Sequence, residues 1–357
     1  MSLRQILLAV LAAGAIQFHA VADTLALQPD APERYVVVKG DTLWDISGKF
    51  LRDPWLWPEI WQVNTAIVNP HLIYPGDTLI LTYDKDGRPR ITVERGPAAD
   101  DGRGASSGSA KLSPQARTEG SSDAIPTIPM DAIAQFLKKA GIIDKADYEK
   151  LPYIVSLQDQ RLIGGEGESA YVRGLPEKPD GRYAVIHLGK AYRNPDAKPG
   201  DVLGYETLEV ASLRVDQPGD PSATMIVTSE REVLRGDRVM ALPNDPMQNF
   251  IPKPAPDGVE GLIVGVVDGI SRIGQYQVVV VNVGKAQGIE PGHVFGVFQS
   301  GRTVHDPYAA ARGGEKVTLP DVHAGVTMVF RTFEKVSYAL VLRSERDIRI
   351  YDKLKKP

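Results

Sequence analysis

The sequence predicts a multidomain α+β protein with a β-α-α-β module, then a flexible linker, then two related small all-β domains. Three observations lead to this prediction. The chain has 357 residues, enough for two or three domains of roughly 100–200 residues each. Residues 84–128 are rich in Gly, Ser, Pro, Asp and Arg, and such a composition buries too little apolar surface to offset its ordering entropy. From residue 151, short runs of Val, Ile and Tyr between Gly and Pro are typical of strands.

Composition and charge exclude several classes of function. Lys and Arg number 41 against 45 Asp and Glu, for a net charge of −4, which argues against a nucleic-acid binder that works by phosphate neutralisation. The sequence contains no cysteine, so it has no disulfide, thiol nucleophile, Cys-ligated metal or lipid-modified cysteine. We expect no cofactor, no metal, no nucleic-acid partner and no stable insertion into a membrane.

The first residues are typical of an export signal. Arg4 precedes an apolar run at residues 6–16, and Ala20-Val21-Ala22 follows. A basic start, a short apolar run and an A-x-A site predict a signal peptide over residues 1–22, cleaved near Ala22. A buried N-terminal helix is the alternative. Cleavage would place the mature protein in the periplasm or at the cell wall.

Residues 33–83 predict a compact unit with the order β-α-α-β. An apolar strand is expected at 35–38, and Gly40 then allows a turn with positive φ. Thr42 can cap the following helix, with Asp45 three residues on. After a second helix, a turn at 73–76 leads into the closing strand at 78–81.

The motifs of this unit resemble those of the LysM family. Residues 35–46 read YVVVKGDTLWDI, and residues 69–80 read NPHLIYPGDTLI. Both motifs and their spacing are similar to the family pattern. The resemblance implies binding of β-1,4-linked N-acetylglucosamine polymers, and hence of peptidoglycan.

In that family two loops form a shallow groove for the glycan. Carried over by the resemblance, the glycan-binding residues are Gly40, Asp41, Thr42, Leu43, Ile73, Tyr74, Pro75 and Gly76. Free backbone N–H groups at the start of a helix can donate to an acetamido carbonyl. A purely structural role is the alternative: the glycines and Thr42 serve turns and a cap in any case, and Leu43 and Ile73 are either core or groove wall.

All four tryptophans lie between residues 44 and 61. The stretch DPWLWPEIW at 53–61 is longer and more aromatic than in a minimal member of the family. We expect Trp44 in the core. Trp55, Trp57 and Trp61 either stack on sugar rings or cover the helices, and covering is the favoured interpretation.

Residues 129–150 predict a short helical segment, in which Asp144 is expected to cap the second helix. Two β domains are then expected at 151–242 and 259–357, because motifs recur in order. YAVIHLGKAYRNPDAKPGD at 183–201 matches YQVVVVNVGKAQGIEPGH at 276–293, and SEREVLRGDRV at 229–239 matches SERDIRIYDKL at 344–354. The growing separation predicts an insertion near 301–322 in the second copy.

Searches for catalytic motifs support no enzyme class. No H-x-E or H-E-x-x-H pattern occurs, so we predict no metal site and no catalytic residue. The favoured function is non-catalytic peptidoglycan binding, with residues 151–357 as a platform for an envelope protein partner. Two alternatives stay open: a peptidoglycan hydrolase with an unrecognised catalytic centre in residues 151–357, and an oligomerisation scaffold.

Overall fold

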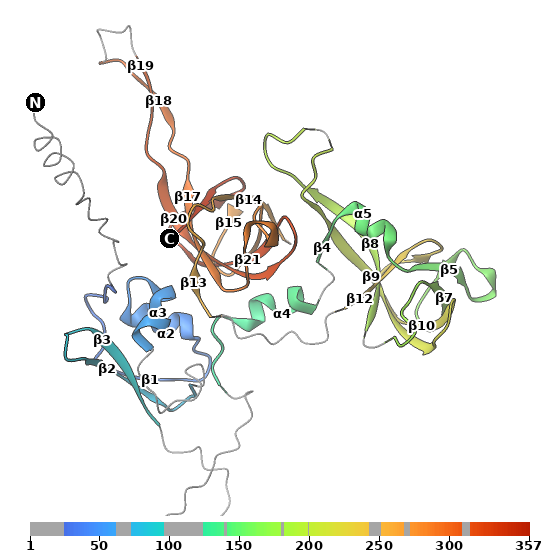
Figure 1. Cartoon of the computed structure of the whole chain (residues 1–357), viewed down its shortest axis with the longest axis horizontal. Helices are drawn as coiled ribbons and strands as arrows, with labels where there is room; N and C mark the ends of the chain where they lie inside the picture. Colours follow the sequence, from blue (N-terminus) through green and yellow to red (C-terminus); the bar gives the residue numbers. More distant parts are fainter. Residues whose placement is uncertain are drawn as a thin grey trace, which may run out of the picture.

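A computed structural model describes residues 25–61, 73–95, 124–138, 141–179, 182–198, 200–242, 251–267, 272–308 and 315–357. The predicted signal peptide at residues 1–22 lies outside these residues, as does the middle of the predicted linker. The described chain is mostly β with few helices. Figure 1 shows a small N-terminal unit, a helix beside it, and two further groups of strands.

The N-terminal unit is a three-stranded antiparallel sheet covered by short helices. Its elements are β1 (Arg34–Val36), α2 (Leu43–Phe50), the 3-10 helix η1 (Pro54–Leu56), α3 (Trp57–Trp61), β2 (Thr78–Tyr83) and β3 (Pro89–Glu94). The sheet order is β1-β2-β3. The predicted order β-α-α-β is therefore present, and a third strand follows it.

Strand β3 corrects the predicted start of the linker at residue 84. Residues 84–88 form a tight turn in which Asp84 Oδ1 accepts hydrogen bonds from the N–H groups of Asp86 (2.9 Å) and Arg88 (2.8 Å). Gly87 has a φ of 75° in this turn. The polar residues that suggested a linker are those of a hairpin turn, and Ile91 of β3 is buried in the core of the unit.

The helical segment joins the N-terminal unit to the later strands. It contains α4 (Met130–Lys138), β4 (Ile142–Ile143) and α5 (Lys145–Lys150). One apolar cluster contains Trp44 of α2, Phe136 of α4 and Tyr338 of a C-terminal strand. The predicted side-chain cap by Asp144 is wrong: its backbone stands at the N-cap position, but its carboxylate lies 3.4 Å from Lys335 Nζ instead.

The first of two larger sheets follows α5. Its strands are β5 (Tyr153–Leu157), β7 (Ser169–Arg173), β8 (Tyr183–Tyr192), β9 (Gly204–Gln217), β10 (Ser222–Ser229) and β12 (Arg238–Ala241), with β4 added on β9. The sheet closes on itself, since the pairing order is β5-β7-β10-β9-β8-β12 and β12 pairs with β5 again. The short strands β6 (Ile163–Gly164) and β11 (Val233–Leu234) pair separately, and the 3-10 helix η2 spans Gln158–Gln160.

The second sheet has the same strand order. Its strands are β14 (Gly261–Val266), β16 (Val278–Val281), β17 (His293–Gln299), β20 (Val322–Thr332), β21 (Ser337–Ser344) and β23 (Lys353–Lys355). The closed order is β14-β16-β21-β20-β17-β23, and β23 returns to β14. Here too a separate pair forms, from β15 (Arg272–Ile273) and β22 (Ile348–Arg349). Strand β13 (Lys253–Pro254) is added on β17, and the 3-10 helix η3 spans Lys285–Gln287.

One predicted motif match agrees with this common order and the other does not. The two SER motifs occupy equivalent places: SEREVLRGDRV connects β10 to β12, and SERDIRIYDKL connects β21 to β23. In both, an aspartate closes the turn. Asp237 Oδ2 accepts from the N–H of Leu234 (2.7 Å), and Asp352 Oδ2 accepts from that of Arg349 (2.8 Å). The Gly-Lys-Ala match is wrong, because residues 189–191 lie inside β8, whereas 284–286 form the cap and the first residues of η3, between β16 and β17.

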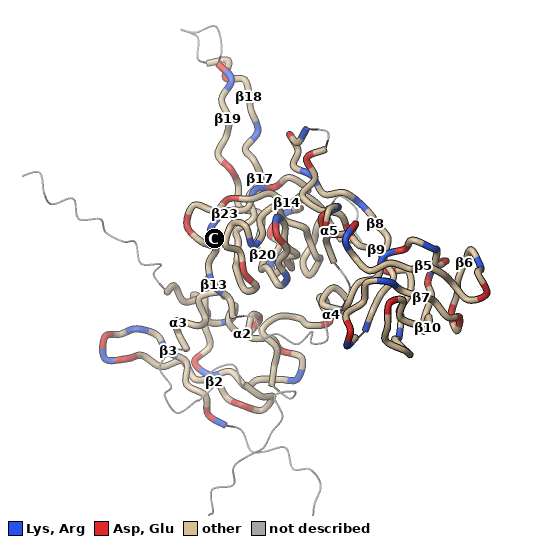
Figure 2. Tube along the Cα trace, turned by 45° about the vertical axis from the view of Figure 1, so that its right-hand side comes forward, with Lys and Arg blue, Asp and Glu red and all other residues tan. Residues whose placement is uncertain are grey.

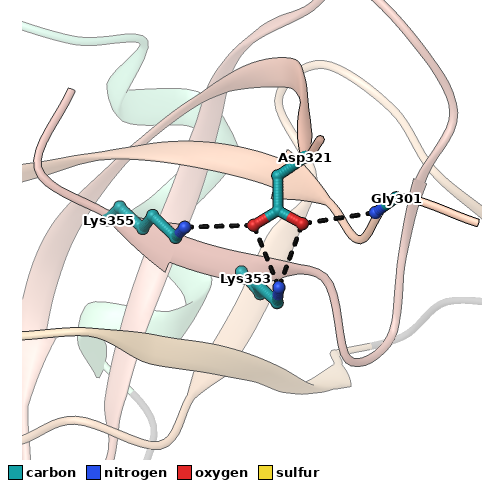
Figure 3. A network of polar contacts seen from close by, with 4 residues as sticks. All are labelled: Gly301, Asp321, Lys353 and Lys355. Atoms are coloured by element: carbon teal, nitrogen blue, oxygen red, sulfur yellow. Dashed lines mark hydrogen bonds and ion pairs between the residues drawn. The ribbon is translucent and has the colours of Figure 1, made fainter. Parts of the chain in front are cut away.

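The predicted insertion near 301–322 is a projecting hairpin of β18 (Thr303–Asp306) and β19 (Glu315–Thr318), seen in Figure 1. Asp321 holds its base (Figure 3). The carboxylate accepts hydrogen bonds from Lys353 Nζ (2.9 and 3.0 Å), Lys355 Nζ (3.0 Å) and the N–H of Gly301 (3.2 Å). These bonds, above all the one from Lys353, lower the pKa of Asp321 to about 2. The base of the hairpin is thereby fixed to β23.

Candidate functional site

The first predicted loop connects β1 to α2 and is held by hydrogen bonds to the side chain of Asp41. Gly40 has a φ of 99°, which a side chain would strain. Asp41 Oδ2 accepts hydrogen bonds from Tyr35 Oη (2.9 Å) and from the N–H of Val38 (2.9 Å). Burial, and then the bond to Asp41, raise the pKa of Tyr35 to about 12. The loop is therefore fixed by its own side chains.

Thr42 caps α2 as the sequence predicts. Its Oγ1 accepts from the N–H of Asp45 (3.1 Å) and donates to Asp45 Oδ2 (2.8 Å). The cap leaves the N–H groups of Leu43 and Trp44 directed away from the helix. The expectation that such donors are free is wrong, because they donate to the carbonyl oxygens of Pro126 (2.9 Å) and Thr127 (3.0 Å).

The second predicted loop, residues 73–76, is held by Asp77. Its Oδ2 accepts from the N–H of Tyr74 (3.1 Å) and pairs with Arg95, whose guanidinium lies 5.5 Å from the centre of the Tyr74 ring. Gly76 donates its N–H to the carbonyl oxygen of Val37 (2.8 Å), which ties this loop to the end of β1. The two loops are therefore neighbours.

Asp77 and Arg95 are supporting residues that the sequence reasoning missed. Asp77 follows the Pro-Gly turn, where an aspartate commonly bonds the backbone of the turn, and this signal was available. Arg95 lies in the stretch interpreted as linker, and its role depends on β3 pairing with β2.

The predicted residues divide into two groups by exposure. Gly40, Pro75 and Gly76 are exposed, and Asp41 and Tyr74 are half-buried. Thr42, Leu43 and Ile73 are buried, and the side chains of Leu43 and Ile73 belong to the core of the unit. These last two therefore face the groove with backbone groups.

Of the predicted residues, Gly40, Asp41, Thr42 and Pro75 border one open hollow of about 450 Å³. Lys39, Asp45, residues 124–126, residues 129–131 and Tyr276 complete its wall. This volume falls within the range of about 300–1,000 Å³ that is usual for small-ligand sites.

Three of the four tryptophans are buried, and Trp55 is partly buried. Trp44, Trp57 and Trp61 are at most 6% exposed. Trp44 stacks on Trp55 with ring centres 6.5 Å apart, and Trp57 meets Trp61 edge to face at 6.1 Å. The favoured interpretation, that Trp44 is core and the others cover the helices, agrees with this packing.

Residues 124–128, assigned by the sequence to the end of the linker, lie between the two loops. Ile125 donates its N–H to the carbonyl oxygen of Ile73 (2.8 Å), while Pro126 and Thr127 accept from the start of α2. Ile125 is 5% exposed and Ile128 is fully buried. The predicted linker is therefore folded at both of its described ends.

Comparison with known proteins agrees with this geometry. Residues 35–82 match the model of the LysM domain family. An uncharacterized protein of Bacillus subtilis (strain 168), YqbP, is 46% identical over 59 residues, which are 14% of this chain and 27% of that protein. The similarity thus spans about a quarter of the relative's length. The chain carries a LysM domain at residues 35–82, which suggests binding of peptidoglycan or another N-acetylglucosamine glycan and is usual in cell-wall-associated proteins.

Proposed function

We propose that this protein binds peptidoglycan without cleaving it, and that the glycan lies between the loops at residues 40–43 and 73–76. The match of residues 35–82 to the LysM domain carries the proposal. The geometry supports it, because Gly76 and Val37 hold the two loops together by a backbone hydrogen bond of 2.8 Å.

The polar groups between the loops suit a neutral sugar. The N–H groups of Leu43 and Trp44 and the carbonyl of Ile73, which bond to residues 125–127 in this structure, match the carbonyl and the N–H of an N-acetyl group. Acidic and basic residues are interspersed along the described chain (Figure 2), in keeping with the net charge of −4. Recognition would therefore depend on amide hydrogen bonds and close backbone approach, not on ion pairs.

Co-sedimentation of the full chain with purified sacculi tests the site. Tyr74→Ala removes a half-buried ring of the second loop, and Tyr83→Ala removes an exposed ring at the far end of β2 as a matched control. A loss of about 1 kcal/mol would lower the affinity about fivefold in the first variant. If both variants and the wild type are retained equally by the sacculi, the glycan does not bind in this groove.

For the later strands we propose two copies of one domain, at residues 151–242 and 259–357, which together form a platform for an envelope protein. The common strand order supports the duplication. The projecting hairpin supports the platform, since Tyr308 is 91% exposed near its tip and Val304 and Val317 are also exposed. Replacing residues 302–319 by a short Gly-Ser turn should abolish capture of the partner from envelope extracts and leave sacculus binding intact. Capture that persists would place the partner elsewhere.

Two further parts of the proposal are open to direct measurement. Export by residues 1–22 predicts a mature chain that begins near Asp23, which N-terminal sequencing of the secreted product determines. Absence of catalysis predicts that labelled sacculi release no soluble muropeptides, with or without divalent metal. Release by the purified protein would instead favour the hydrolase and direct attention to residues 151–357.

A further inference from the structure

We propose that residues 124–128 regulate the glycan site by occupying it, so that glycan enters only when this segment leaves. The inference rests on the proposed function, because it concerns the same groove. It follows from three features of the segment: its hydrogen bonds, its prolines and its two buried isoleucines.

The segment uses the groups that the groove offers to a sugar. The carbonyls of Pro126 and Thr127 accept from the first N–H groups of α2, at 2.9 and 3.0 Å, and the N–H of Ile125 donates to Ile73 at 2.8 Å. A peptide group and an N-acetyl group are both secondary amides, with one carbonyl acceptor and one N–H donor. The two ligands therefore compete for the same three backbone partners.

The prolines prepare the segment for this position. Pro126 and Pro129 have no N–H group, and a residue that precedes a proline is held in the extended region. Both isoleucines precede a proline in the stretch Ala-Ile-Pro-Thr-Ile-Pro. The segment thus reaches the groove already extended, and its closure loses less conformational entropy than closure of an ordinary loop.

The isoleucines hold the segment at two places. Ile125 packs in the core of the LysM domain, and Ile128 packs in the cluster that contains Trp44 and Phe136. Burial of one isoleucine side chain is worth about tenfold or more in an equilibrium constant. The closed form is therefore dominant in the free protein, and the apparent affinity for glycan is lowered by the small fraction that is open.

The first test weakens the closed form in the full chain. Ile125→Ser removes one buried apolar contact of the segment, and Ile348→Ser makes the same change in the apolar core of the C-terminal strands as a matched control. Titration with the N-acetylglucosamine hexamer and with purified sacculi should give an affinity about tenfold higher for Ile125→Ser and unchanged for the control. An Ile125→Ser variant that binds no better than the wild type overturns the inference.

A second measurement needs no variant and so does not depend on its folding. Amide hydrogen exchange is followed by NMR in the wild type with and without the hexamer. Bound glycan should accelerate exchange at Ile125, whose partner at Ile73 it takes, while Leu43 and Trp44 stay protected. If Ile125 stays protected in a saturated complex, the segment has not moved and the inference is refuted, with the proposed function intact. If neither hexamer nor sacculi bind to any variant, the proposed function itself is refuted.

Discussion

The cap formed by Thr42 gives the sharpest test of how the site is built. Thr42→Val keeps the volume of this side chain, which is 4% exposed, and removes the hydroxyl. That hydroxyl accepts from the N–H of Asp45 at 3.1 Å and donates to its carboxylate at 2.8 Å. Loss of an N-cap costs about 0.5–2 kcal/mol. Since two bonds disappear here, we expect a loss of about 1–2 kcal/mol in the free energy of unfolding.

Tryptophan emission is the assay, because all four tryptophans lie between residues 44 and 61. Urea titrations followed by this signal report on the LysM domain within the full chain. Thr42→Ser keeps the hydroxyl and is the control, with a loss of about 0.8 kcal/mol or less for the missing methyl group. If the serine variant is destabilised as much as the valine variant, the hydroxyl does not hold the start of α2.

Three further predictions concern other parts of the chain. Asp321→Asn should lower stability at neutral pH but not near pH 2, as measured by denaturant titrations followed by circular dichroism. The pKa of Asp321 in the folded protein, about 2, lies below the ordinary 3.8. The stabilisation by the carboxylate is therefore present above about pH 4 and is lost as the pH falls through 2. Asp41→Asn should lower the pKa of Tyr35 from about 12 toward 10.0. The titration of Tyr35 alone is obtained as the difference in phenolate absorbance between chains that carry Tyr35 and otherwise identical chains with Tyr35→Phe. The raised pKa stabilises the fold below pH 10, and this contribution is lost as the pH rises through 12. Gly284→Ala would place a Cβ 2.5 Å from a backbone carbonyl oxygen, and the resulting strain should reduce the free energy of unfolding by about 1–3 kcal/mol, measured by the loss of β-sheet circular dichroism.

The parts of the site that sequence could predict are those set by neighbouring residues. The turn at Gly40 and the cap at Thr42 depend on spacings of two or three residues, and both are present. The turns of the two SER motifs are equally local, because Asp237 and Asp352 each bond a backbone group three positions earlier. Local hydrogen bonds leave a signal in the order of residues.

The missed parts depend on contacts between distant residues. Strand β3 lies in a polar stretch, and only its pairing with β2 identifies it. Ile125 and Ile128 are isolated apolar residues beside prolines, and their partners are on α2 and beyond α4. The Gly-Lys-Ala match failed for a related reason: a hydrophobic run before glycine fits both the middle of the long strand β8 and the exit from β16.

The cluster of Trp44, Ile128, Phe136 and Tyr338 also determines where this chain can be cut. A fragment that ends at Glu94 would expose Trp44 and leave two amide donors of α2 to water, and one that starts at Met130 would expose the face of Phe136. Both fragments would expose apolar surface that is buried in the full chain, and this surface would cause non-specific binding in an assay. Limited proteolysis of the intact chain would show whether residues 124–138 stay with the LysM fragment or with the C-terminal fragment. The fragment that retains them is the one with which this stretch folds.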